Sequence, residues 1–85
     1  MKVLIPSALR SYTERAEIEA SGATLAAVVA ELDRRYPGIR FRMINEQGRI
    51  RPHIRFFVDG EQLFDLALPL GPARELIIVQ ALSGG

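Results

Sequence analysis

The chain ends in the residues ALSGG, so two consecutive glycines, Gly84 and Gly85, occupy its last two positions. An α-carboxylate is unreactive at neutral pH, but a nucleotide-dependent partner can activate it as an acyl-adenylate that a sulfur, oxygen or amine nucleophile then attacks. Such a terminus must pass through a narrow cleft with its carbonyl unshielded. Glycine suits both needs, because it lacks a Cβ and accepts almost any backbone conformation. The terminus therefore predicts a substrate for adenylation, and a frayed end that merely tolerates glycine is the alternative interpretation.

The side chains provide few alternatives to chemistry at this terminus. The chain has no cysteine, which excludes a disulfide framework, a thiolate nucleophile, an iron–sulfur cluster and a cysteine-ligated zinc. His53 is the only histidine and is expected to face solvent, so no metal site is predicted. No nucleophile–base or acid–base pair emerges, and we therefore expect that the chain is not an enzyme. Any sulfur that it carries must sit on the main-chain terminus.

Composition and charge narrow the class of protein. The 85 residues suffice for one small domain over 1–85, with 81–85 expected as an exposed tail. A net charge of +1 gives no bulk attraction to nucleic acid or to a membrane. The longest aliphatic run, LAAVVA, is too short to span a bilayer, and Pro6 and Arg10 cut the apolar start too short for a signal peptide. We expect a cytoplasmic protein with neither nucleic acid nor membrane among its partners.

The first half of the chain predicts two strands and one helix. Residues 2–5 (KVLI) form a short strand, and residues 14–20 (ERAEIEA) alternate as in a strand with one wet side, its inner face formed by Ala16, Ile18 and Ala20. The connection PSALRSYT is expected to join them as a hairpin. A helix capped by Thr24 and stopped by Pro37-Gly38 follows. Its apolar stripe comprises Leu25, Val28, Val29, Leu32 and Tyr36.

The second half predicts three further strands. Residues 39–53 form a long connection with one short helical turn. Residues 54–58 and 61–64 are strands joined by an Asp59-Gly60 turn, and residues 75–80 (ELIIVQ) form a strand that is apolar on both faces, as in the centre of a sheet. The order β–β–α–β–β–β, with both apolar strands central and parallel, predicts an α+β β-grasp (ubiquitin-like) fold. Its mixed sheet of four to five strands packs on one main helix and ends in a flexible Gly-Gly tail.

Three segments carry a resemblance to the MoaD/ThiS family of ubiquitin-like sulfur carriers: the helix GATLAAVVAELDRRYPG, the hairpin FFVDGEQL and the last strand with ALSGG. The opening IPSALRSYT is most similar to the carriers of a thiocarboxylate-dependent cysteine synthesis. The resemblance implies that Gly85 carries a thiocarboxylate. A ubiquitin-activating-type adenylyltransferase would make it with ATP, and the chain itself would bind no cofactor. Further implied partners are a sulfur-accepting synthase, with a pyridoxal-phosphate enzyme as one candidate, and a metalloprotease that trims the tail.

The surface that meets these partners is expected to include aromatic residues and the tail. Phe56 and Phe57 are consecutive on a strand, so one ring faces the helix and the other lies on the open sheet face, where it binds a partner or is covered by a loop. Leu82 and Ser83 are expected to extend this partner-binding surface toward the glycines. Two related functions stay open: a protein modifier joined through Gly85 to lysines, and the small subunit of a molybdopterin synthase.

The middle of the chain is rich in arginine, with Glu46 as the only acidic residue among them. One interpretation is a basic patch for RNA or for an acidic groove of a partner, which would make the protein an interaction module with an incidental tail. The favoured interpretation is a solvated loop whose charges are offset by the acids of residues 14–33, because the overall charge is near neutral and no aromatic platform is evident. The arginines are Arg40, Arg42, Arg49, Arg51 and Arg55.

Overall fold

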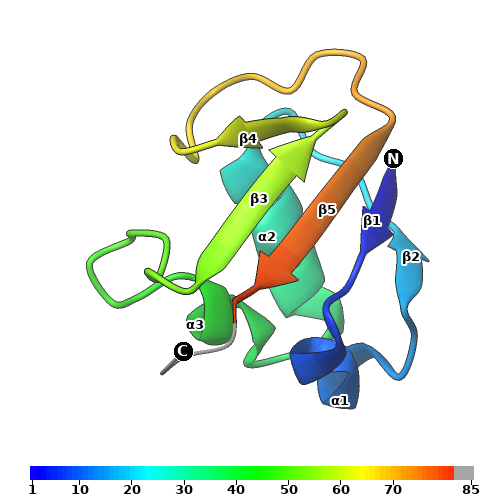
Figure 1. Ribbon diagram of the computed structural model, residues 1–85, viewed down its shortest axis with the longest axis vertical. Helices are drawn as coiled ribbons and strands as arrows, with labels where there is room; N and C mark the ends of the chain where they lie inside the picture. The colour runs from blue at the N-terminus through cyan, green and yellow to red at the C-terminus, as the bar shows by residue number, and fades with distance from the viewer. Residues whose placement is uncertain (82–85) are drawn as a thin grey trace.

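The structure is a computed structural model that describes residues 1–81 (Figure 1). One sheet and one long helix form its two layers, and short helices close the end of the molecule at which the chain leaves the sheet. The elements in chain order are β1 (Lys2–Leu4), the 3-10 helix η1 (Ser7–Leu9), α1 (Arg10–Thr13), β2 (Glu17–Glu19), α2 (Leu25–Arg35), α3 (Ile39–Met43), β3 (Ile54–Val58), β4 (Glu61–Leu63) and β5 (Glu75–Gln80).

The sheet has five strands in the order β2-β1-β5-β3-β4. β1 and β5 are parallel, with Val3 opposite Leu76, whereas β1–β2, β3–β5 and β3–β4 are antiparallel. α2 crosses one face of this sheet (Figure 1). β5 therefore lies at the centre, as its apolar sequence predicts, and the β-grasp fold is confirmed.

The core lies between α2 and the inner face of the sheet. Leu25, Val28, Val29 and Leu32 of α2 are buried, which confirms the predicted stripe except for Tyr36, which follows the end of the helix and is half-buried. The helix begins where the sequence predicts, because the Thr24 side chain accepts a hydrogen bond from the Ala27 amide at 3.1 Å. The sheet and the shorter elements complete the core with Val3, Ile5, Leu9, Ile18, Ala20, Ile39, Met43, Ile44, Ile54, Phe56, Leu76 and Ile78.

The segment between β1 and β2 differs from its prediction. Residues 7–13 are helical rather than a plain connection, and the strand predicted over 14–20 is limited to 17–19. Glu14 ends α1 with a φ of 58°, a left-handed conformation that a strand residue does not adopt. Ala16 is consequently exposed, although it was expected on the inner face with Ile18 and Ala20.

Two glycines are required by the local geometry. Asp59 and Gly60 have φ values of 48° and 86°, which confirms the predicted hairpin turn between β3 and β4. Gly22 approaches α2 so closely that a Cβ there would lie 2.7 Å from the backbone nitrogen of Val28. The Asp59 carboxylate also accepts hydrogen bonds from the amides of Arg74 and Glu75, at 3.1 and 3.0 Å, and so fixes the start of β5.

Candidate functional site

The chain leaves the body from the centre of the sheet. The Ala81 amide donates a 2.7 Å hydrogen bond to the carbonyl of His53, directly after Gln80 ends β5 opposite Ile54. This end of β5 lies near α3 (Figure 1). The predicted site residues Leu82, Ser83, Gly84 and Gly85 lie outside the described residues. The described body thus holds the residue immediately before them by a backbone hydrogen bond.

The two consecutive phenylalanines of β3 lie on opposite faces of the sheet. Phe56 has no exposed surface, so it belongs to the core, and its expected role in partner binding is wrong. Phe57 is half-buried and lies on the face away from α2. The alternation of a strand therefore leaves Phe57 as the ring that a partner can reach.

Phe57 belongs to an apolar area on the open face of the sheet. Its register neighbour on β5 is Ile77, which in turn lies opposite Leu4 of β1. Val79, two residues before Ala81, is on the same face and is 36% exposed. We name these four residues, Leu4, Phe57, Ile77 and Val79, the open-face patch. It leads along β5 toward the point where the chain leaves the body.

The arginines of residues 40–55 form no direct ion pair with an acidic side chain of residues 1–81. The ion pairs formed within residues 1–81 join the N-terminus to Glu19, Lys2 to Glu75 and Arg34 to Glu31. The hydrogen bond from Arg34 lowers the pKa of the Glu31 carboxyl, so this acid is already engaged. Asp33 is engaged as well, because its carboxylate accepts from the amides of Gly38 and Arg40. Within residues 1–81 these arginines therefore form no direct ion pair with the acids of residues 14–33, and the charge-balanced loop stays an interpretation.

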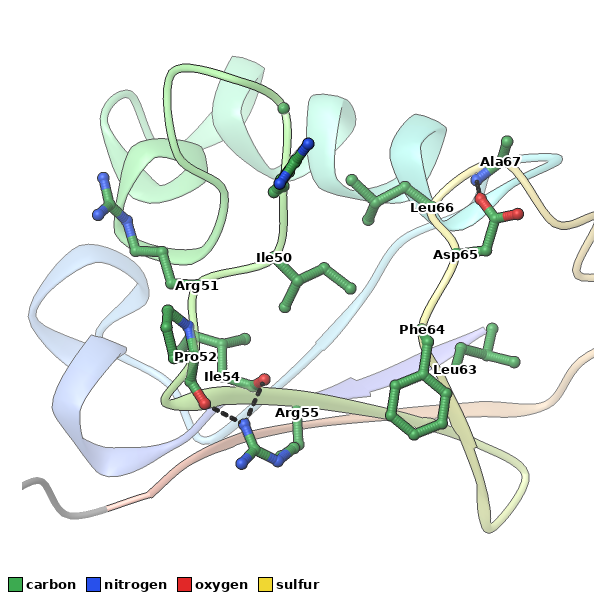
Figure 2. A pocket seen from close by; sticks show the side chains of 12 residues that line it. Ile50, Arg51, Pro52, Ile54, Arg55, Leu63, Phe64, Asp65, Leu66 and Ala67 are labelled. Atoms are coloured by element: carbon green, nitrogen blue, oxygen red, sulfur yellow. Dashed lines mark hydrogen bonds between the residues drawn. The ribbon is translucent and has the colours of Figure 1, made fainter.

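A groove that the sequence did not predict lies between this arginine-rich segment and the segment after β4. Its volume is about 630 Å³, and its walls are formed within residues 48–52, 54–55 and 63–67 (Figure 2). Phe64 was expected as the last residue of a strand, but β4 ends at Leu63 and the Phe64 side chain is 78% exposed at the groove. Residues 48–52 and 65–67 of the walls were interpreted as connections, and the predicted strands 54–58 and 61–64 gave no sign that their ends would lie beside one another there.

Within residues 1–81 no arrangement points to metal or membrane. No group of three or more histidine or acidic side chains is placed to hold a metal ion in this part of the chain. None of its helices is long and apolar enough to cross a bilayer. The features available to a partner are therefore the base of the tail, the open-face patch and the groove.

The five-stranded mixed sheet, its single long covering helix and the chain end that leaves the central strand define a ubiquitin-like β-grasp protein. The model of the ThiS family matches residues 3–85. The sulfur carrier protein CysO of Mycobacterium tuberculosis is 30% identical over 98% of this chain and 96% of its own length. The chain therefore belongs to the ThiS family, which confirms the predicted resemblance, and it is homologous to a sulfur carrier.

Solved structures agree with this assignment. The crystal structure of Mycobacterium tuberculosis CysO has a TM-score of 0.87 at 29% identity and covers 95% of this chain and 98% of its own. CysO in the BexX/CysO complex of Amycolatopsis orientalis also has a TM-score of 0.87, at 28% identity over 99% of this chain and 98% of that one. The small archaeal modifier protein 1 of Methanosarcina acetivorans, with a TM-score of 0.79 and 24% identity over 99% of this chain and 94% of that one, shares the fold.

Proposed function

We propose that this protein carries sulfur as a C-terminal thiocarboxylate on Gly85. The carboxylate of Gly85 attacks the α-phosphorus of ATP on a ubiquitin-activating-type enzyme, and pyrophosphate leaves. Hydrosulfide supplied to that enzyme then attacks the acyl carbon, the bond from this carbon to the AMP oxygen breaks, and AMP leaves the thiocarboxylate. The observation that carries this proposal is a terminal Gly-Gly on a β-grasp body of the ThiS family. The chain is thus a co-substrate of cytoplasmic enzymes rather than a catalyst, with no cofactor of its own.

The sulfur acceptor that we propose is a synthase that makes cysteine. The support is the likeness of residues 5–13 (IPSALRSYT) to carriers of that route, together with the homology to a sulfur carrier protein CysO. A pyridoxal-phosphate enzyme is the class of synthase that this chemistry favours. A metalloprotease that exposes or trims the Gly-Gly end fits the same proposal.

The body contributes position rather than chemistry. The hydrogen bond between Ala81 and His53 fixes the base of the tail to the residue that precedes β3. The open-face patch lies beside this base and offers the apolar contact through which an activating enzyme can seat the body. A rigid body held in this way would limit the conformations open to the tail and aid delivery of the Gly85 carboxylate to an adenylation site.

The mass of the protein purified from its own cells tests this proposal directly. We expect a fraction whose mass has gained the difference between sulfur and oxygen, located in the C-terminal peptide and trapped by a thiol-selective alkylator. If the loaded form is short-lived, incubation with ATP, a sulfide source and the activating enzyme of the same organism must produce it. Failure in both experiments would overturn sulfur carriage, and lysine adducts through Gly85 in cell extract would indicate a protein modifier instead.

Replacing Phe57 by serine is expected to weaken recognition by the activating enzyme. The change removes the largest ring from the open-face patch, and burying such a ring in an interface contributes about 1.5–3 kcal/mol. We therefore expect KM for the carrier to rise about tenfold or more while kcat stays within about twofold. Steady-state pyrophosphate release measures both quantities.

The matched control for this change is Leu68→Ser. Leu68 is 44% exposed but lies in the loop between β4 and β5, away from the open-face patch. KM should stay at the wild-type value in this variant. An equal rise in both variants, or no rise for Phe57→Ser at a temperature where circular dichroism shows that the variant is folded, would show that the open-face patch is not the docking surface.

A further inference from the structure

The groove next to β4 combines an aliphatic floor with an exposed aromatic ring. Figure 2 shows Ile50 and Leu66 facing one another across it, and Ile54 and Leu63 lie at its base. The Phe64 ring, at 78% exposure, is the most exposed large apolar side chain among residues 1–81. Exposing such a ring beside an apolar hollow leaves solvent-accessible apolar area that a partner side chain could cover. The volume of about 630 Å³ is in the range of sites that hold one or a few side chains.

The charged side chains at the rim of the groove are mainly positive. Arg49 is exposed, and its side chain forms no ion pair with residues 1–81. The Arg55 guanidinium is held at the rim by hydrogen bonds to the carbonyl oxygens of Pro52 and Ile54 (Figure 2). Arg51 is turned outward and stacks on Phe41, with its guanidinium 4.5 Å from the ring centroid. The acid opposite them, Asp65, already accepts a 2.9 Å hydrogen bond from the Ala67 amide.

We propose that this groove binds an acidic peptide segment of a protein partner, with one large apolar side chain of that segment packed against Phe64 and the aliphatic floor. The carboxylates of the segment pair with Arg49 and Arg55, whose charges have no acidic partner within residues 1–81. Interfaces are enriched in arginine and aromatic residues, which is the combination present here. The proposal rests on the function proposed above, because the segment belongs to an enzyme that loads or unloads the carrier.

The position of the groove makes it a second contact, separate from the open-face patch. Ile54 lies in the base of the groove and is paired with Gln80, one residue before Ala81. A segment bound here therefore lies near the base of the tail, while the open-face patch covers the other surface of β3 and β5, and Arg55, the register neighbour of Val79, borders both sites. Two contacts around one chain end would fix the orientation of the body as well as its distance from the partner.

A nucleic acid is the competing occupant, and the lining argues against it. Single-stranded nucleic acid is bound by several aromatic faces on which successive bases stack. Phe64 is the one aromatic side chain among the residues that line this groove, and the remaining floor is aliphatic. Aliphatic side chains suit the apolar residues of a peptide.

The test is an NMR titration of the complete ¹⁵N-labelled protein. The probe is a synthetic decapeptide in which acidic residues alternate with uncharged ones and one phenylalanine lies at the centre. We expect the amide signals of residues 48–55 and 63–67 to shift on titration. Affinity should fall about fivefold for Arg49→Glu, since an exposed ion pair contributes up to about 1 kcal/mol. It should fall about tenfold for Phe64→Ser, which removes the apolar anchor. Raising the salt from about 50 mM to about 500 mM should weaken binding further.

Control variants and probes distinguish specific binding in the groove from non-specific attraction of the peptide to exposed charges or apolar side chains. Arg74→Glu and Leu68→Ser change an exposed arginine and an exposed leucine outside the groove, and both should bind the peptide like the wild type. A basic peptide of the same length should not bind. Shifts confined to the open-face patch, no shifts at all, or binding of a uridine decanucleotide in place of the peptide would overturn the proposal.

The loading experiment distinguishes failure of the groove from failure of the function. Peptide binding is measured on the unloaded protein, whereas sulfur carriage is read from the mass of the C-terminal peptide. A thiocarboxylate without groove binding would refute the groove alone. Groove binding without any thiocarboxylate would refute sulfur carriage and the assignment of the segment to a loading enzyme.

Discussion

Deletion of Gly85 is expected to abolish adenylation and thiocarboxylate formation while the body stays folded. Removing one residue moves the terminal carboxylate by about 3.5 Å along an extended chain. A misplacement of about 1 Å already costs on the order of a hundredfold in rate, so activity should fall by at least that factor. The buried apolar residues of the described chain all lie between Val3 and Ile78, so the melting temperature should not change. Pyrophosphate exchange and intact mass measure the loss.

The variant Gly85→Ala is the matched control, because it keeps the length and adds only a Cβ. If position is decisive, the substitution should lose less activity than the deletion. If an unshielded carbonyl is decisive, the substitution should be equally inactive, since the Cβ blocks the incoming nucleophile. Normal turnover by the deletion variant would refute the role of Gly85 and with it the proposed function.

Replacing Phe56 by alanine is expected to cost about 3–5 kcal/mol of unfolding free energy. The ring is fully buried between the sheet and α2, and the neighbouring backbone cannot collapse into the space without breaking the pairing of β3 with β5. A small domain has only about 5–15 kcal/mol of stability in total, so this change should remove a large fraction of it. Urea denaturation followed by circular dichroism measures the change.

Phe57→Ala is the control for this loss of stability. It removes the same side chain from the next residue of the same strand, but the Phe57 ring is only half-buried. A cost of about 1–2 kcal/mol is expected from the apolar area that it loses. Equal destabilisation by the two variants would contradict the assignment of Phe56 to the core and Phe57 to the surface. The pair thus separates a folding role from a recognition role.

The parts of the fold that were predicted from the sequence are those with local signals. β3 and β5 have the predicted bounds, because an Asp-Gly turn limits one strand and an apolar run surrounded by polar residues marks the other. The start of α2 was also predicted, since Thr24 caps it and the apolar stripe follows. The ThiS family membership could be inferred for the same reason, because these segments carry the resemblance.

The segments that could not be predicted depend on contacts between distant residues. α1 is a single turn, too short for a periodic pattern, and Arg10 stabilises it by donating a 3.0 Å hydrogen bond to the Ile5 carbonyl. The groove needs residues 48–55 beside residues 63–67, a juxtaposition that no local pattern specifies. The pairing of the arginines is a similar case, because sequence gives the number of nearby acids but only the fold shows which of them form ion pairs.

The central position of β5 has a consequence for the synthesis of the protein. β5 is the only strand that joins the β1–β2 hairpin to the β3–β4 hairpin, and it is the last of the described elements to be made. Until β5 emerges from the ribosome, the β1–β2 and β3–β4 pairs, which precede and follow α2 in the chain, both have unpaired strand edges. Such edges promote association with other chains. Folding of this domain is therefore a late, non-local event that completes only when its final strand enters the sheet.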